Sequence, residues 1–103
     1  MIVHVKVSYS EGQNPMATKA GTQALADFIS YMDRQTDFPG VKPIFVAWQD
    51  QRPASGYGFF HCESADQMQA FLKGMPGTPR LDIVAVNDLK EMAARAISHV
   101  EAM

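Results

Sequence analysis

The chain has 103 residues, of which 47% are apolar and 19% charged, and its formal net charge is −2. A chain of this length predicts one domain, residues 1–103, with a single hydrophobic core. Its Lys and Arg residues are scattered, whereas nucleic acids and anionic membranes are bound through clustered positive charge. We therefore expect neither a nucleic acid nor a membrane as a partner.

The sequence has no long apolar stretch that could span a bilayer, and its start lacks the pattern of a signal peptide. These features predict a cytoplasmic protein. The one cysteine, Cys62, cannot form an internal disulfide, and we interpret it as a small buried apolar residue. Gly56 and Gly58 flank a predicted strand without the helix start and Lys of a phosphate loop, so no cofactor is predicted.

The first half of the chain predicts a strand, a long helix and a second strand. Residues 1–9 alternate apolar and polar side chains, which is typical of a strand with one apolar face. Asn14 as a cap and proline at the first helical position precede a helix over about residues 16–35 with one apolar stripe. Residues 41–49 predict the second strand, and Pro43 indicates that this strand lies at a sheet edge.

The third predicted strand ends directly at a helix start. Residues 57–62 form this strand, and Ser64 with Gln67 has the spacing of a capping box. In that motif the Ser64 hydroxyl caps the helix while Gln67 reaches back to the N–H of Ser64. The helix is expected over about residues 65–73.

A fourth strand and a last helix complete the predicted fold. Residues 80–86 alternate as a strand does, and Asp88 with Glu91 opens a helix that carries an apolar stripe. The order β-α-β-β-α-β with an extra C-terminal helix predicts an α+β, ferredoxin-like fold. In this plan the first and third strands are central neighbours in a four-stranded antiparallel sheet, and the helices cover one face.

The second and third strands are apolar on both of their faces. Two helices can cover only one face, so the other face requires a partner. We expect a second copy of the chain to supply it, which gives a homodimer whose sheets close toward a barrel. The alternative is that several of these aromatic residues line a pocket within one chain. The alternating sets are Phe45 and Ala47 against Ile44, Val46 and Trp48, and Tyr57 and Phe59 against Phe60 and Cys62.

Two parts of the chain resemble known proteins. The ends resemble those of muconolactone isomerase-like proteins, with the segments MIVHVKV and LKGMPGTPRLDIVAVNDL. The middle, GYGFFHCESAD, is more similar to small bacterial members of the dimeric α/β-barrel superfamily. The resemblance implies a dimeric barrel, a scaffold that isomerases, polyketide cyclases, monooxygenases and non-catalytic stress proteins share.

The candidate catalytic residues are His4, His61 and Tyr57. If the two central strands pair with His4 near His61, both imidazoles lie on one face together with Lys6, Tyr57 and Phe59. Imidazole titrates near neutral pH and a phenol can stabilise an oxyanion, so these groups suit acid–base work on an enol or lactone. The alternative is that both histidines are hydrogen-bonded structural residues.

Asp82 on the fourth strand could join the two histidines as a metal set, or it could pair with Lys6 or Arg80. No close sequence spacing supports the metal set, so no metal is predicted. An apolar lining between helices and sheet is expected to bind a small ligand, although aromatic residues at such spacing often form only core. The predicted ligand-binding residues are Trp48, Tyr9, Phe28, Phe45, Phe60 and Met32.

The sequence therefore predicts a homodimeric protein that binds a small apolar or aromatic molecule. A cofactor-independent isomerase is the leading enzymatic interpretation, ahead of a lyase, cyclase or monooxygenase. The alternative is a non-catalytic homodimeric binding or stress-response protein.

Overall fold

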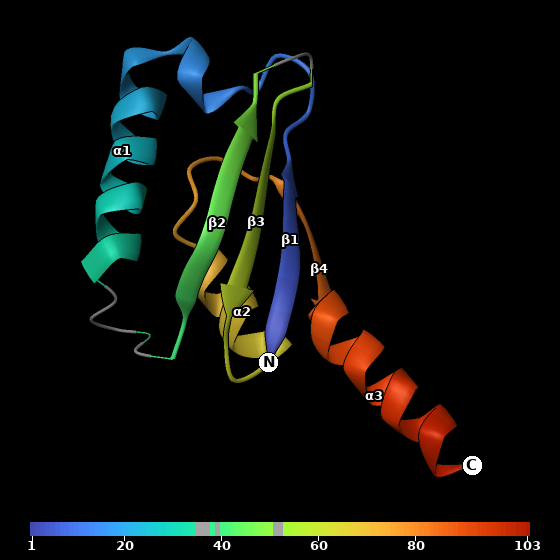
Figure 1. The fold of residues 1–103 in the computed structure, drawn as a ribbon. Helices are drawn as coiled ribbons and strands as arrows, with labels where there is room; N and C mark the ends of the chain where they lie inside the picture. The colour runs from blue at the N-terminus through green and yellow to red at the C-terminus, as the bar shows by residue number, and fades with distance from the viewer. Residues whose placement is uncertain (35–37, 39, 51–52) are drawn as a thin grey trace.

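The computed structural model describes residues 1–34, 38, 40–50 and 53–103. Over these residues the chain forms four strands and three α-helices in one α+β unit (Figure 1). The elements are β1 (Ile2–Ser8), a short 3-10 helix η1 (Pro15–Ala17), α1 (Lys19–Arg34), β2 (Lys42–Gln49), β3 (Ser55–His61), α2 (Ala65–Leu72), β4 (Arg80–Val86) and α3 (Leu89–Ala102).

The four strands form one antiparallel sheet in the order β2-β3-β1-β4. This order confirms the prediction that the first and third strands are central, and it places β2 at an edge, as Pro43 predicts. The register pairs Val3 with Phe60 and His4 with Phe59. The ladder between β2 and β3 shifts between Pro43 and Phe45, so the edge strand carries an irregularity where proline cannot donate.

The hydrophobic core lies between one face of the sheet and the helices α1 and α2. Val3, Val5 and Val7 of β1 are at most 5% exposed and point to this face. The Phe71 ring of α2, which is 1% exposed, lies at the core's centre. Its neighbours are the rings of Phe28, Tyr31, Phe38 and Phe60. Burying an aromatic side chain of this size stabilises the fold by about 1.5–3 kcal/mol.

Cys62 belongs to the same core. Its side chain is 4% exposed, which agrees with its interpretation as a small buried residue. Burial raises the pKa of its thiol, although the nearby N-terminal ammonium acts in the opposite direction. The N-terminal nitrogen also donates to the carbonyl oxygen of Cys62 at 2.9 Å.

The long helix begins three residues later than the sequence predicts. Asn14 does act as a cap, because its Oδ1 accepts from the N–H of Met16 at 2.9 Å, but it caps η1. Thr18 is extended, and its Oγ1 accepts from the N–H of Gly21 at 3.0 Å. A side-chain oxygen in this position caps a new helix, so α1 starts at Lys19.

The two other predicted caps are present, with one difference. Ser64 Oγ accepts from the N–H of Gln67 at 3.1 Å, and Asp88 Oδ1 accepts from the N–H of Glu91 at 3.0 Å. Gln67 Oε1, however, accepts from the N–H of Glu63 at 2.8 Å, not from that of Ser64 as expected. The glutamine side chain therefore stabilises the backbone one residue earlier than the usual capping box does.

The last helix, α3, has no buried residue. Figure 1 shows it leaving the end of β4 and extending away from the sheet. The apolar side chains of Leu89, Met92, Ile97 and Val100 are all exposed on it. None of the helices in the described ranges is long and apolar enough to cross a membrane.

Candidate functional site

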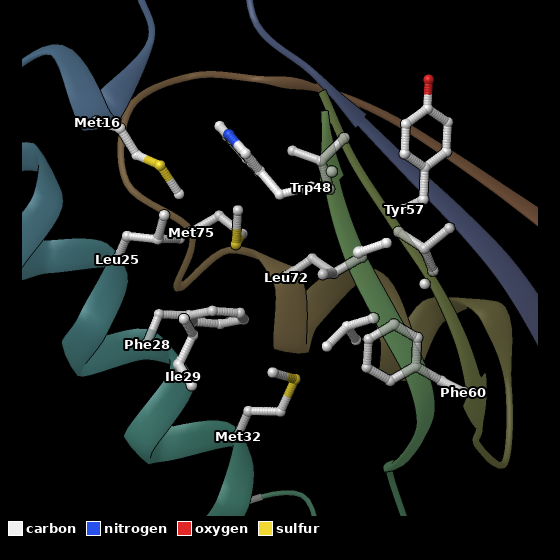
Figure 2. Close-up of a pocket in the computed structure, with 16 residues that line it drawn as sticks. Met16, Leu25, Phe28, Ile29, Met32, Trp48, Tyr57, Phe60, Leu72 and Met75 are labelled. Carbon is white, nitrogen blue, oxygen red and sulfur yellow. The ribbon is translucent and has the colours of Figure 1, made fainter. Parts of the chain in front are cut away.

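A cavity of about 220 Å³ lies between α1 and the helix-side face of β2 and β3. Figure 2 shows Leu25, Phe28 and Met32 of α1 on one wall, with Trp48 and Phe60 of the sheet on the other. Leu72 and Met75 lie between the two walls in the same view. The α1 side chains that face the cavity are those of the apolar stripe that the helical spacing predicts.

Two glycines of β3 shape the sheet wall of this cavity. A Cβ added to Gly58 would lie 2.5 Å from the Phe60 ring, and one added to Gly56 would lie 3.4 Å from the Trp48 ring. A side chain at Gly58 would therefore displace Phe60 from its place on the strand, because real contacts are never that short. The glycines let the two aromatic rings lie close against the β3 backbone.

The cavity opens to solvent along the β2 edge. Met16, Ile29 and Val46 line it and are between 41% and 47% exposed. Leu25, Phe28 and Met32, which also line it, are at most 7% exposed. A small molecule could therefore enter at the β2 edge and reach a buried apolar interior.

Trp48 contributes an indole ring, with one polar atom, to the cavity lining. Its Nε1 is buried, and it has no hydrogen-bond partner among the residues that the structure describes. Tyr57 also borders the cavity, but Figure 2 shows its ring pointing away from the space. The remaining lining side chains are aliphatic, aromatic or methionine, so the cavity favours an apolar ligand.

Four of the six predicted ligand-binding residues line this cavity: Trp48, Phe28, Phe60 and Met32. Tyr9 does not line it. Its ring lies beside Trp48, with centroids 6.0 Å apart, and its hydroxyl donates to the carbonyl oxygen of Pro76 at 2.7 Å. Burial raises the pKa of the Tyr9 hydroxyl.

Phe45 lies on the opposite face of the sheet, which corrects its expected place between helices and sheet. Its neighbour on β3 is Phe59, and its side chain is 65% exposed. Phe45 and Trp48 are three residues apart on β2, so the alternation of side chains places them on opposite faces. The cavity residues that sequence reasoning did not assign to a ligand include Leu25, Ile29 and Val46. Leu25 and Ile29 belong to the predicted apolar stripe of the helix, which was the available signal.

The predicted catalytic residues share the face of the sheet that no helix covers. β1 and β3 pair His4 with Phe59, Ile2 with His61 and Lys6 with Tyr57, so both imidazoles and the Tyr57 ring lie on this face. We call it the open face, formed by His4, Lys6, Phe45, Tyr57, Phe59, His61, Asp82 and Val84. The observed register therefore places the two histidines on one face, and the alternation separates them from the cavity on the other side.

The groups of the open face contact one another. The His4 ring lies 4.9 Å from the Phe59 ring and 6.3 Å from the Tyr57 ring, measured between centroids. Lys6 Nζ lies 5.7 Å from the centroid of Tyr57, and the Tyr57 hydroxyl donates to Gln49 Oε1 at 3.1 Å. The ring contacts of His4 do not extend to His61, which lies at the exposed end of β3.

Asp82 forms an ion pair with Arg80 on the open face, with Nε and Oδ2 3.5 Å apart. This is one of the two ordinary roles that the sequence suggests for it. The other expected neighbour, Lys6, lies opposite Asp82 in the pairing of β1 with β4. Over the described ranges, the structure brings together no group of three or more His, Cys, Asp or Glu side chains that could hold a metal ion.

Comparison with known proteins bears on the fold. No protein-family model and no curated protein matches the chain. Among solved structures, the chain is similar to a candidate antibiotic biosynthesis monooxygenase from Caulobacter crescentus CB15, with 10% sequence identity and a TM-score of 0.50. The likeness covers 84% of this chain and 91% of that one. Together with the strand order and the helices on one face, it shows that the chain has a ferredoxin-like fold.

Proposed function

We propose that the chain binds a small apolar or aromatic molecule in the cavity between α1 and the sheet. The observation that carries this proposal is an open cavity of about 220 Å³ with an almost entirely apolar lining. An apolar cavity of about 150 Å³ in another protein holds benzene, so this space suits a molecule of one or two rings. Apolar clefts with few polar groups are the usual form of small-molecule sites.

We further propose that the protein acts as a homodimer. Two surfaces expose large apolar side chains: the open face, where Phe45 and Val84 are 65% and 57% exposed, and α3, where Leu89 is 82% exposed. Contiguous apolar surfaces of this kind mark interfaces in proteins. A second copy of the chain would cover these surfaces with the same two surfaces of its own, as in the self-complementary contact of a symmetric dimer.

Whether the bound molecule is transformed is a separate question with two answers. A non-catalytic binding protein is favoured by the cavity lining, because none of its described residues points a titratable side chain into the space. The enzymatic interpretation, a cofactor-independent isomerase, uses His4, His61 and Tyr57 on the open face. It therefore requires the substrate to lie between the two sheets of a dimer, where these groups could transfer a proton.

Binding in the cavity is tested by narrowing it from the sheet side. Val46→Phe adds bulk at the cavity, whereas the matched control Val84→Phe makes the same change on the open face. Binding of indane is followed by NMR of 13C-labelled methionine methyl groups. Val46→Phe should bind indane about tenfold more weakly, because the larger side chain takes up space in the cavity; this factor equals a loss of about 1.4 kcal/mol in binding free energy. The control should bind indane like the unchanged protein. Equal affinities in all three proteins would contradict the proposed site.

The isomerase interpretation is tested by proton exchange. In D2O, an acid–base enzyme should speed deuterium incorporation next to the carbonyl of an unsaturated five-membered lactone, as followed by NMR. His61→Ala should then abolish this exchange and leave the dimer and the melting temperature nearly unchanged. Exchange no faster than in buffer, with indane still bound in the cavity, would favour the binding protein.

A further inference from the structure

We propose that Trp48 selects ligands that carry a neutral hydrogen-bond acceptor on an apolar ring system, such as an aromatic ketone, by donating its indole N–H to that acceptor. This inference rests on the proposed function, because it concerns the molecule bound in the same cavity. It adds the chemical group that the ligand presents and the residue that recognises it.

The first observation is that the Trp48 N–H lacks a protein partner. Its Nε1 is buried, and its N–H donates to no residue in the described ranges. Indole nitrogen is a donor only, and a buried donor without an acceptor costs about 1–3 kcal/mol. The neighbouring buried aromatic residue, Tyr9, shows the contrast, because its hydroxyl donates to the carbonyl oxygen of Pro76 at 2.7 Å.

The second observation is that the indole lines the cavity and packs against neighbours on two sides. Its six-membered ring packs on the Gly56 backbone, where a Cβ would lie 3.4 Å away. Its other side meets Tyr9, which the bond to Pro76 holds in place. Figure 2 shows the nitrogen on the part of the ring that extends from β2 toward Met16. The donor is therefore held in position before a ligand arrives, which lowers the entropic cost of binding.

The third observation concerns the charge of the acceptor. Among the residues that the structure describes, the cavity lining contains no Lys, Arg or His side chain that could pair with a carboxylate. Moving a carboxylate into an apolar space without a cationic partner is far more costly than moving a carbonyl. A neutral oxygen acceptor on an apolar body therefore fits this site better than an acid does.

The test uses two ligands that differ only in the acceptor. Indane and 1-indanone share the same fused rings, and only 1-indanone carries a carbonyl oxygen. Both are titrated into the unchanged protein and into Trp48→Phe, which keeps an aromatic ring and removes the N–H. Affinities are measured by NMR of 13C-labelled methionine methyl groups, a signal that does not depend on Trp48.

The expected result is a change in the ratio of the two affinities. The ratio of the 1-indanone affinity to the indane affinity should be about fivefold larger in the unchanged protein than in Trp48→Phe. This is the size expected for one hydrogen bond. Comparing ratios cancels the different solubilities of the ligands and any general loss of packing in the variant. Trp48 is the one tryptophan of the chain, so its single indole N–H signal should also move downfield with 1-indanone and much less with indane.

Failure of this inference differs from failure of the proposed function. If both ligands bind and their affinity ratio is the same in the two proteins, the cavity binds apolar molecules but Trp48 does not select the acceptor. If neither ligand binds the unchanged protein, the proposed function and this inference both fail. If an acid such as indane-1-carboxylic acid binds more tightly than 1-indanone, the assignment of a neutral acceptor is overturned.

Discussion

The two faces of the sheet differ in what covers them and in the chemistry that they present. The helix side buries β1 valines, α2 and part of α1 around Phe71, and it leaves an apolar cavity under α1. The open face carries the titratable groups, His4 and Lys6 among them, next to exposed aromatic rings. Binding capacity and acid–base chemistry are therefore on opposite sides of one sheet.

This difference follows from the alternation of side chains along each strand. Successive residues point to opposite faces, so Val5 reaches the core while His4 and Lys6, its neighbours, reach the open face. The cavity residues and the groups of the open face are therefore held by the same strands, but they do not contact one another. Variants on one face should affect ligand binding or core stability, and variants on the other should affect self-association.

The largest expected effect is on the helix side. Phe71→Ala should lower the free energy of unfolding by about 3–5 kcal/mol, because a buried ring is removed and a void remains. Phe45→Ala truncates the same kind of side chain on the open face and should cost about 1 kcal/mol or less. Urea denaturation at low protein concentration measures both. Equal losses in the two variants would remove the distinction between a covered and an uncovered face.

A smaller effect is expected on self-association. Phe45→Asp places a charge in the proposed interface and should raise the dissociation constant of the dimer about 30-fold or more, since a central interface residue contributes about 2 kcal/mol. Gln69→Asp, on the exposed side of α2, is the control and should leave the constant unchanged. Sedimentation equilibrium gives the constants. An unchanged protein that stays monomeric at all concentrations would contradict the dimer.

The smallest effect concerns the pH dependence of stability. The ordinary pKa of a tyrosine hydroxyl is 10.0, and burial raises the pKa of Tyr9 above it. The folded state therefore favours the protonated form, which stabilises it fully below pH 10.0 and progressively less as pH rises through the folded-state pKa. Tyr9→Phe removes this titration, so its stability should fall less steeply above pH 10.0 in alkaline urea melts. Parallel slopes would show that Tyr9 does not titrate differently in the folded state.

Local signals in the sequence predict much of the fold. Strict alternation in residues 1–9 and 80–86 defines two strands and their faces, and Pro43 identifies the edge strand because proline lacks an N–H. Asp88 and Ser64 identify helix starts because their side chains cap backbone N–H groups. The shared face of His4 and His61 depends in addition on the register between β1 and β3, which the alternation alone does not determine.

The candidate site depends on long-range packing that such signals do not contain. The cavity lies between the sheet and α1, which begins at Lys19, and no residue pattern encodes the separation of the two. The position of Tyr9 depends on a bond to Pro76, 67 residues away. The position of Phe45, by contrast, follows from the alternation along β2, which puts it on the face opposite Trp48. The Trp48 donor was recognisable as a candidate by residue type, but its lack of a partner appears only in the folded chain.

The most direct test of the account is to find which face of the sheet a bound ligand contacts. Indane can be titrated into labelled protein while NMR follows the Met32 and Met75 methyl groups, the Trp48 indole and the His4 and His61 rings. The account predicts large shifts at Met32, Met75 and Trp48, which line the cavity, with the histidine signals almost unmoved. Shifts centred on the two histidines, with the methionine signals unchanged, would place binding on the open face and contradict it.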